Sequence, residues 1–117
     1  MHELGLCEGV VQAVRARAAG RTVSRVALRV GAAHAVDEGS LRQAFELVAA
    51  GTEADGASLL VTTVPMQMSC AACGAEASSN DPLAVCPSCG SVEVALAGGD
   101  ELTLESLTYA PVPSPPA

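Results

Sequence analysis

Large aromatic side chains are nearly absent from this chain of 117 residues. It has no tryptophan, one phenylalanine (Phe45) and one tyrosine (Tyr109). A core must therefore be aliphatic, although half of the residues are hydrophobic. A small chain with so few large anchors gains from an additional constraint, such as a bound metal ion.

Lysine is absent as well, and the six arginines all lie within the first 42 residues, so that the net charge is -7 at pH 7. Nucleic-acid binding takes much of its affinity from clustered lysine and arginine, which this acidic chain lacks. No apolar run approaches the ~18 residues of a membrane-spanning helix. The first residues also lack the basic and then apolar pattern of a signal peptide. We expect a cytoplasmic protein that binds neither nucleic acid nor membrane.

Apolar periodicity predicts an α+β domain. The spacing is helical in residues 4–19 and 41–48, and it alternates as in strands in residues 23–30 and 102–109. Residues 58–64 are rich in β-branched residues and end before Pro65, which also predicts a strand. Ser40 to Gln43 form a capping-box pattern at the start of the second helix. Residues 67–90 show no periodicity, and residues 92–96 alternate again. We expect the last strand to return to the sheet formed by the two earlier strands.

Four of the five cysteines form two C-x-x-C-G motifs, Cys70/Cys73 and Cys86/Cys89. Each motif brings two thiolates to one side of a tight turn, and two such turns complete a tetrahedral site for which Zn(II) is the usual occupant. Four thiolates leave no position for a reactive water, so the zinc would be structural. Rubredoxin-like iron and two disulfides are the alternatives. A thioredoxin-like redox pair would need a helix after the motif, and neither motif has one.

These features predict a small mixed sheet with two helices and an inserted zinc-ribbon-like domain. The zinc-binding domain spans residues 66–97. The surrounding α/β domain is discontinuous and consists of residues 1–65 and 98–109. The proline-rich residues 110–117 are predicted to be a disordered tail.

The N-terminus offers a second metal site. The amine of Met1, the backbone nitrogen and imidazole of His2, and the backbone nitrogen of Glu3 can form a square-planar nitrogen set, which suits Ni(II) or Cu(II). The Glu3 carboxylate could orient the imidazole. A histidine at position 2 is also common as plain surface, so this pattern alone leaves both readings open. Cys7 is expected to be a buried small hydrophobe, and His34 to be polar surface in the connection before the second helix.

Several further segments accompany these motifs: the start Met-His-Glu-Leu-Gly-Leu-Cys-Glu, Val26–Gly31, Leu41–Glu46, Gly51-Thr52, Gly56-Ala57, Val64-Pro65, Ser91 and Gly99-Asp-Glu-Leu102. Together they resemble the HypA/HybF family of hydrogenase maturation nickel chaperones. The resemblance extends from Met1 to about Tyr109. Its most specific element is the Met-His-Glu start combined with the paired cysteine motifs.

The resemblance implies that His2 binds nickel together with N-terminal backbone nitrogens, that Glu3 supports this site, and that the four paired cysteines hold zinc. It also implies a HypB-like maturation GTPase as partner and the large subunit of [NiFe] hydrogenase as the recipient of nickel. Urease maturation proteins are further partners by family analogy. The chain has no G-x-x-x-x-G-K-[ST] loop, so nucleotide chemistry would belong to the partner.

We therefore predict a metallochaperone and not an enzyme. An enzyme would need an open metal site or an activated nucleophile, and the sequence shows no suitable group of residues. A zinc-ribbon interaction module would share the cysteine motifs but would have no use for His2. The sequence does not predict the oligomeric state, the nickel affinity or the surface that docks a partner.

Overall fold

The computed structural model describes residues 2–111 and, for His2, the backbone alone. Met1 and residues 112–117 of the predicted tail lie outside the described residues. The chain divides into two compact units: unit 1 comprises residues up to 28, 37–60 and from 104 onward, and unit 2 comprises residues 29–36 and 61–103. The domain boundaries expected at residues 66 and 97 stay a prediction. None of the helices within residues 2–111 is long and apolar enough to cross a lipid bilayer.

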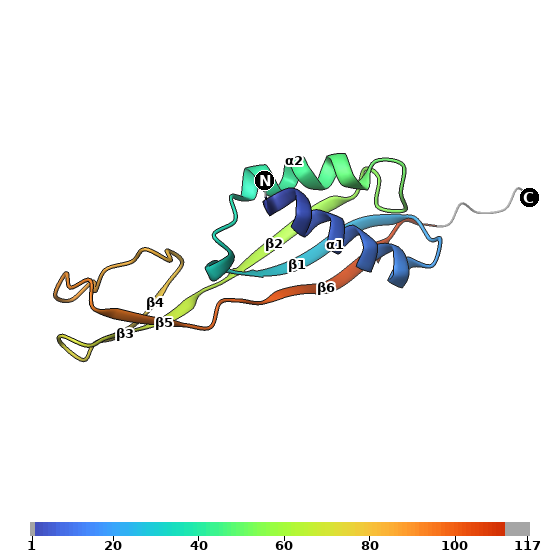
Figure 1. The fold of residues 1–117 in the computed structure, drawn as a ribbon. Helices are drawn as coiled ribbons and strands as arrows, with labels where there is room; N and C mark the ends of the chain where they lie inside the picture. Colours follow the sequence, from blue (N-terminus) through green and yellow to red (C-terminus); the bar gives the residue numbers. More distant parts are fainter. Residues whose placement is uncertain (1, 112–117) are drawn as a thin grey trace, which may run out of the picture. The chain divides into compact units, whose positions relative to one another are not determined.

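Two helices lie side by side over one face of the sheet in unit 1, α1 (His2–Ala18) and α2 (Glu38–Ala49) (Figure 1). Their apolar stripes face the sheet, as the helical periodicity predicted. The buried side chains are Cys7, Val10, Val11, Val14 and Ala18 from α1, and Leu41, Ala44, Phe45 and Ala49 from α2.

The start of α2 differs from the prediction. Asp37 is the N-cap residue, and its carboxylate accepts hydrogen bonds from the backbone N–H and the hydroxyl of Ser40, both at 2.9 Å. The backbone N–H of Ser40, followed by its hydroxyl, lowers the pKa of Asp37. The predicted capping box from Ser40 to Gln43 is therefore wrong, because an acidic cap three residues earlier already satisfies the N–H of Ser40.

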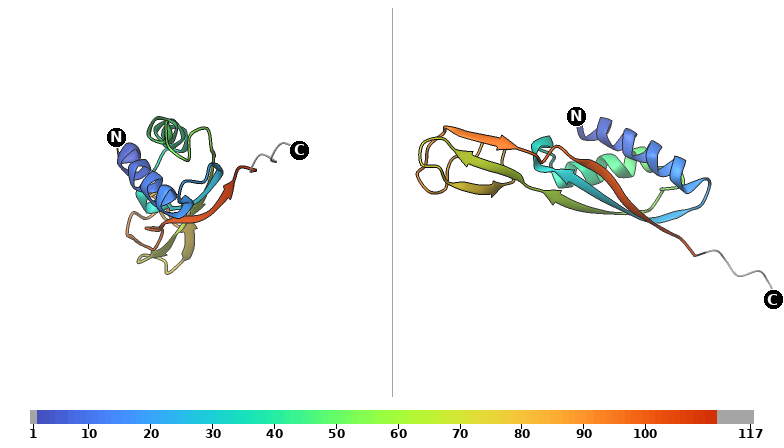
Figure 2. Two further views of the ribbon diagram at one scale, coloured as in Figure 1. Left: turned by 90° about the vertical axis from the view of Figure 1, so that its right-hand side faces the viewer. Right: turned by 90° about the horizontal axis from the view of Figure 1, so that it is seen from below.

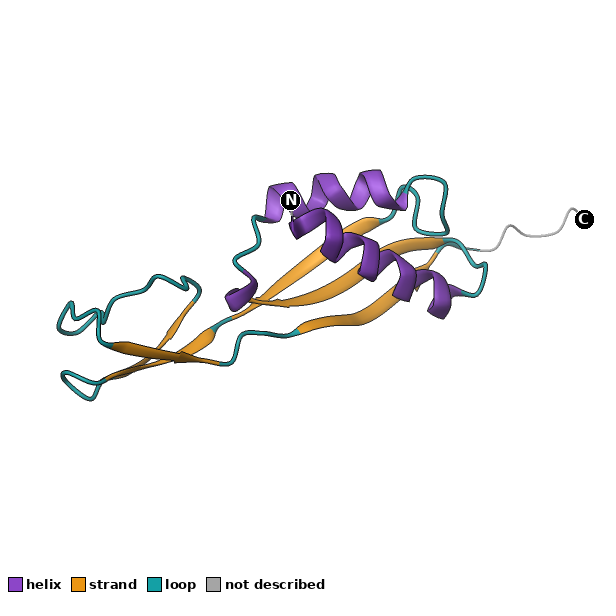
Figure 3. Cartoon of the chain, viewed as in Figure 1, coloured by secondary structure: helices purple, strands orange, loops and turns teal. Residues whose placement is uncertain are grey.

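The first sheet has the order β2-β1-β6, with β1 (Val23–Gly31) in the centre, β2 (Ser58–Val64) on one side and β6 (Leu102–Tyr109) on the other. Strands β1 and β2 run in the same direction and β6 runs in the opposite one (Figure 3). Val26 and Leu28 of β1 are buried. The mixed sheet confirms that the last strand returns beside the first.

Unit 2 contains a second sheet, of order β4-β3-β5, which consists of β3 (Met66–Cys70), β4 (Glu76–Ser79) and β5 (Val94–Ala97). Both pairings are antiparallel, and Met68 lies opposite Ala77 on one side and Leu96 on the other. Met66, Met68 and Cys70 are buried and alternate with exposed residues. The prediction that residues 67–90 have no periodicity is thus wrong for β3. Two helices, a mixed sheet and this small sheet confirm the α+β fold class.

Within unit 2, the backbone around the short 3-10 helix η1 (Ala32–His34) lies close to the backbone of residues 99–101. The N–H of Gly31 donates to the carbonyl of Glu101 at 2.7 Å, and the N–H of Ala33 donates to that of Gly99 at 2.8 Å. A Cβ atom at residue 31 would overlap the carbonyl oxygen of Gly99. Glycine is therefore required at position 31 by close approach of two backbone segments.

Candidate metal centres

The two C-x-x-C-G turns share two backbone hydrogen bonds. In each turn, the N–H of the first cysteine, Cys70 or Cys86, donates at 2.9 Å to the carbonyl five residues later. The glycine N–H donates back to the carbonyl of that cysteine, at 2.9 Å from Gly74 and 2.8 Å from Gly90. Both glycines have positive φ, 76° and 74°, which favours glycine over any residue with a Cβ atom. Each sequence motif therefore folds locally into a turn that presents two thiols.

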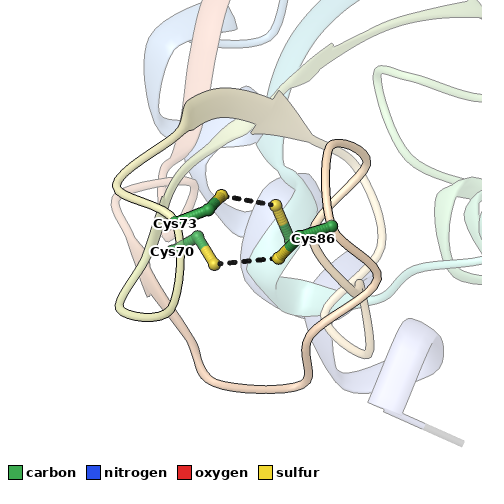
Figure 4. Close-up of side chains that lie close together, drawn as sticks. Cys70, Cys73 and Cys86 are labelled. Atoms are coloured by element: carbon green, nitrogen blue, oxygen red, sulfur yellow. Dashed lines mark hydrogen bonds between the residues drawn. The ribbon is translucent and has the colours of Figure 1, made fainter.

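The four thiols converge from the two turns (Figure 4). The Sγ atoms of Cys70 and Cys89 are 3.7 Å apart, and those of Cys73 and Cys86 are 3.6 Å apart. All four Sγ atoms lie within 4.8 Å of one another. Tetrahedral zinc with Zn–S bonds of ~2.3 Å would separate its sulfur ligands by about 3.8 Å. The arrangement fits a four-thiolate zinc site.

Other observations agree with this interpretation. All five cysteines carry free thiols, which gives no support to the two-disulfide alternative. Among the side chains that the structure describes, these four cysteines are the one group of three or more His, Cys, Asp and Glu residues placed to hold a metal ion. Cys70 and Cys86 are buried, whereas Cys73 and Cys89 are exposed.

The thiols are not equivalent as acids. The backbone N–H of Cys89, opposed by burial and assisted by the N–H of Ser88, lowers the pKa of Cys86 to about 6. The backbone N–H of Ser91 lowers the pKa of Cys89, but the thiol of Cys70 and burial outweigh it and raise that pKa to about 12. Thiols this close cannot all ionise unaided, because the resulting thiolates repel one another.

Unit 2 has too few basic residues to neutralise four thiolates. Arg29 is its only arginine, and it has no lysine. Its acidic residues are Glu76, Asp81, Glu93, Asp100 and Glu101. A cation that binds all four sulfur atoms would supply the missing charge and displace the thiol protons. The sulfur-only donor set favours zinc over magnesium or calcium, which prefer oxygen ligands.

His2 and Glu3, which are predicted to take part in the nickel site, lie in the first turn of α1, which begins at His2. The first four N–H groups of a helix have no acceptor within the helix, so the amides of His2 and Glu3 can bind a metal without breaking helical hydrogen bonds. Glu3 is half-buried in this turn. Met1 and the imidazole of His2 lie outside what the structure describes, so the nickel ligand set stays a prediction.

Cys7 is separate from the four-thiol cluster. Its side chain is 1% exposed, and its thiol donates to the carbonyl of Leu41 at 3.4 Å, so that it joins α1 to α2. Burial, followed by the charge of Glu3, raises the pKa of Cys7 to about 11. Cys7 is therefore the buried packing residue that the sequence predicted.

His34 is half-buried in η1, and its Nε2 atom lies 2.9 Å from the carbonyl oxygen of Asp100. The sequence placed His34 correctly between β1 and α2 but gave no sign of this contact, because the two residues are 66 positions apart. The His34 side chain therefore adds a contact to the two backbone hydrogen bonds that join the segment around η1 to residues 99–101.

Comparison with known proteins identifies the family. The chain matches the family model "Hydrogenase/urease nickel incorporation, metallochaperone, hypA" over residues 1–109. It is 39% identical over 112 residues to the hydrogenase maturation factor HypA of Acidithiobacillus ferrooxidans, and the match covers 92% of this chain and 97% of that one. The corresponding protein of Chlorobium limicola is 38% identical over 112 residues, with 92% and 96% covered.

Among solved structures, the solution structure of the Ni metallochaperone HypA from Helicobacter pylori has a TM-score of 0.58 and 21% sequence identity. This match covers 92% of this chain and 96% of that one, and it shows a shared fold. The family model and the sequence identities also show common ancestry. This chain belongs to the HypA family of nickel-incorporation metallochaperones.

Proposed function

We propose that this chain carries Ni(II) on its N-terminus and delivers it, together with a maturation GTPase, to the large subunit of [NiFe] hydrogenase. The observation that carries the proposal is the match to the nickel-incorporation family, which begins at residue 1 and therefore includes the Met-His-Glu start. The relatives named as hydrogenase maturation factors support hydrogenase as the client. The family description also names urease, so urease is a second nickel enzyme to test as a client.

The nickel set consists of the Met1 amine, the amide nitrogen and imidazole of His2, and the amide nitrogen of Glu3. These four nitrogens suit the square-planar geometry of Ni(II). The amides belong to the first turn of α1, where helix formation makes no use of their N–H groups. A chain terminus can release its cargo when a ligand is protonated or when an acceptor competes, without unfolding the core.

The zinc set consists of Cys70, Cys73, Cys86 and Cys89. Zinc would supply four Zn–S bonds that join the two turns of unit 2, and it would leave no coordination position for a substrate. The chain is accordingly a carrier and not a catalyst. Its zinc domain comprises residues 66–97 as an insertion in the nickel-binding domain, and a reducing cytoplasm would keep the thiols available for the metal.

The test is a calorimetric titration of untagged protein with Ni(II), accompanied by absorption spectra for a square-planar centre and by zinc analysis. The substitution His2→Ala should abolish tight nickel binding and leave zinc content unchanged. His34→Ala is the matched control, because it removes the other histidine and should retain nickel binding. Nickel affinity that is unchanged in His2→Ala would exclude the N-terminal site.

A second variant tests the amine. One or two residues added before Met1 convert its amine to an amide and move it away from the chain terminus. This extension should weaken nickel binding without any change to a side chain. Retention of full affinity in the extended protein would show that the ligands lie elsewhere.

A further inference from the structure

The four thiols of unit 2 differ in accessibility, and the difference is arranged in pairs. Cys73 and Cys89 are exposed. Cys70 and Cys86 are buried, with exposed fractions of 4% and 1%. Each short sulfur contact joins an exposed thiol to a buried one, at 3.7 Å between Cys89 and Cys70 and at 3.6 Å between Cys73 and Cys86. An oxidant in solution can therefore reach one sulfur atom of each pair while the other stays covered.

Both short contacts also join one cysteine turn to the other, as the dashed lines in Figure 4 show. The turns lie at the same end of the small sheet, since Cys70 at the end of β3 pairs with Val94 at the start of β5 (Figure 2). A disulfide bond measures ~2.05 Å, so each pair must close by about 1.6 Å to form one. Oxidation of both pairs would therefore link the two turns covalently.

The chemistry of cysteine oxidation matches this arrangement. A hydroperoxide transfers one oxygen atom to an accessible thiol and gives a sulfenic acid, and a neighbouring thiol attacks that sulfur to give a disulfide. With hydrogen peroxide each of the two steps releases one molecule of water, so each pair gives two electrons to one peroxide molecule. When the four sulfur atoms start as thiolates, the reaction also takes up four protons from solvent. A disulfide offers no thiolate, so Zn(II) loses its ligands and leaves as the free ion.

The surface charge around the first turn favours an uncharged oxidant. The N–H of Ala71 in this turn donates to the carbonyl of Glu93 at 2.9 Å, and Glu76 lies opposite Ser69 in the pairing of β3 with β4. Both glutamates are exposed. Their carboxylates repel anionic oxidants such as oxidised glutathione, whereas hydrogen peroxide is small and neutral.

We propose that the two exposed thiols are sites of oxidation by hydroperoxides, and that the buried thiol beside each one completes a disulfide between the turns, with release of zinc. The disulfides are Cys73–Cys86 and Cys70–Cys89. This inference rests on the proposed function in one respect, because it takes the four cysteines to hold zinc in the reduced protein. It adds an oxidised state of the same residues, which thiols can reverse. The predicted nickel ligands are nitrogen atoms and take no part in it.

The experiment treats zinc-loaded, untagged protein with hydrogen peroxide and then removes the excess with catalase. A chromophoric chelator measures released zinc. Cleavage of the unreduced protein at Glu76 and Asp81 separates the two turns, so their peptides stay joined only by disulfides between turns. We expect loss of the bound zinc, joined peptides whose mass is lower by two hydrogen atoms per disulfide, and recovery of zinc binding after reduction and addition of Zn(II). Cys7→Ala is the control and should behave as wild type, because the buried Cys7 lies outside the cluster.

Histidine variants test the pairing. Sites with three cysteines and one histidine are common for zinc, so Cys73→His and Cys89→His should both load zinc. Oxidised Cys73→His should contain only the Cys70–Cys89 disulfide and leave Cys86 as a free thiol. Oxidised Cys89→His should contain only Cys73–Cys86 and leave Cys70 free. If a variant does not load zinc, the peptide maps of wild type and Cys7→Ala still decide the pairing.

Three results would overturn the proposal. The first is zinc that stays bound in excess peroxide. The second is a pair of disulfides within the turns, Cys70–Cys73 and Cys86–Cys89, which would leave the two peptides separate. The third is oxidation of the exposed thiols to sulfinic acid without any disulfide. Protein that holds no zinc before peroxide is added would refute the zinc set of the proposed function as well, and the zinc analysis of untreated protein distinguishes that failure from the other three.

Discussion

Removal of zinc should unfold the small sheet β3–β5 and leave α1 and α2 folded. Between residues 61 and 103 the buried apolar side chains are Met66 and Met68, together with the thiols of Cys70 and Cys86. Burial of a methionine contributes about 1.5–3 kcal/mol, so the pair contributes roughly 3–6 kcal/mol. A structural zinc contributes an apparent ~10–16 kcal/mol in small zinc domains at pH 7. The metal therefore outweighs the apolar core of this sheet by about twofold or more.

The substitution Cys73→Ser tests this reasoning without creating a cavity, because the Cys73 side chain is exposed. It should lower the zinc content and abolish hydrogen-exchange protection of the β3 and β5 amides, while α1 and α2 keep theirs. Mass spectrometry of exchanged peptides gives both readings, and chelation of wild-type zinc should reproduce them. Ser88→Ala is the control: it lies inside the second cysteine motif, is exposed and offers no metal ligand.

Two outcomes would contradict the prediction. A zinc-free protein with protected β3 and β5 amides would show that the small sheet is stable without metal. Equal loss of protection in α1 and α2 would show that unit 1 also depends on zinc, contrary to its larger set of buried side chains.

Two further predictions concern close packing and thiol chemistry. Gly31→Ala should lower the free energy of unfolding by about 1–3 kcal/mol, because its Cβ atom would overlap a backbone carbonyl. Gly9→Ala in α1, where a Cβ atom meets nothing within 4 Å, should raise it by up to about 1 kcal/mol. Denaturant unfolding measures both changes in free energy. If the two substitutions changed the free energy of unfolding by the same amount and in the same direction, the steric argument would be refuted. The pKa of Cys7, raised to about 11, keeps this thiol protonated at pH 8 and its alkylation slow. Rapid labelling of Cys7 in native, zinc-loaded protein would contradict this.

The sequence predicted the helices, β1 and β6 because their apolar residues repeat at regular intervals, and β2 because it is rich in β-branched residues. It missed β3, where only Met66, Met68 and Cys70 alternate, and it missed β4, which has only four small or polar residues. It also placed the cap of α2 at Ser40, because a serine followed by a glutamine three residues later resembles a capping box. The carboxylate of Asp37 takes that place in the structure, and both positions are compatible with the local sequence.

The sequence by itself determined the two thiol turns, because the two hydrogen bonds that close each of them lie within six consecutive residues and need only the glycine after the second cysteine. Only the tertiary structure decided that Cys70 lies next to Cys89 and Cys73 next to Cys86, since twelve residues separate Cys73 from Cys86 in the chain. It likewise decided that β1 is central in its sheet. Local backbone geometry follows from neighbouring residues, whereas these contacts depend on how segments distant in the chain pack together.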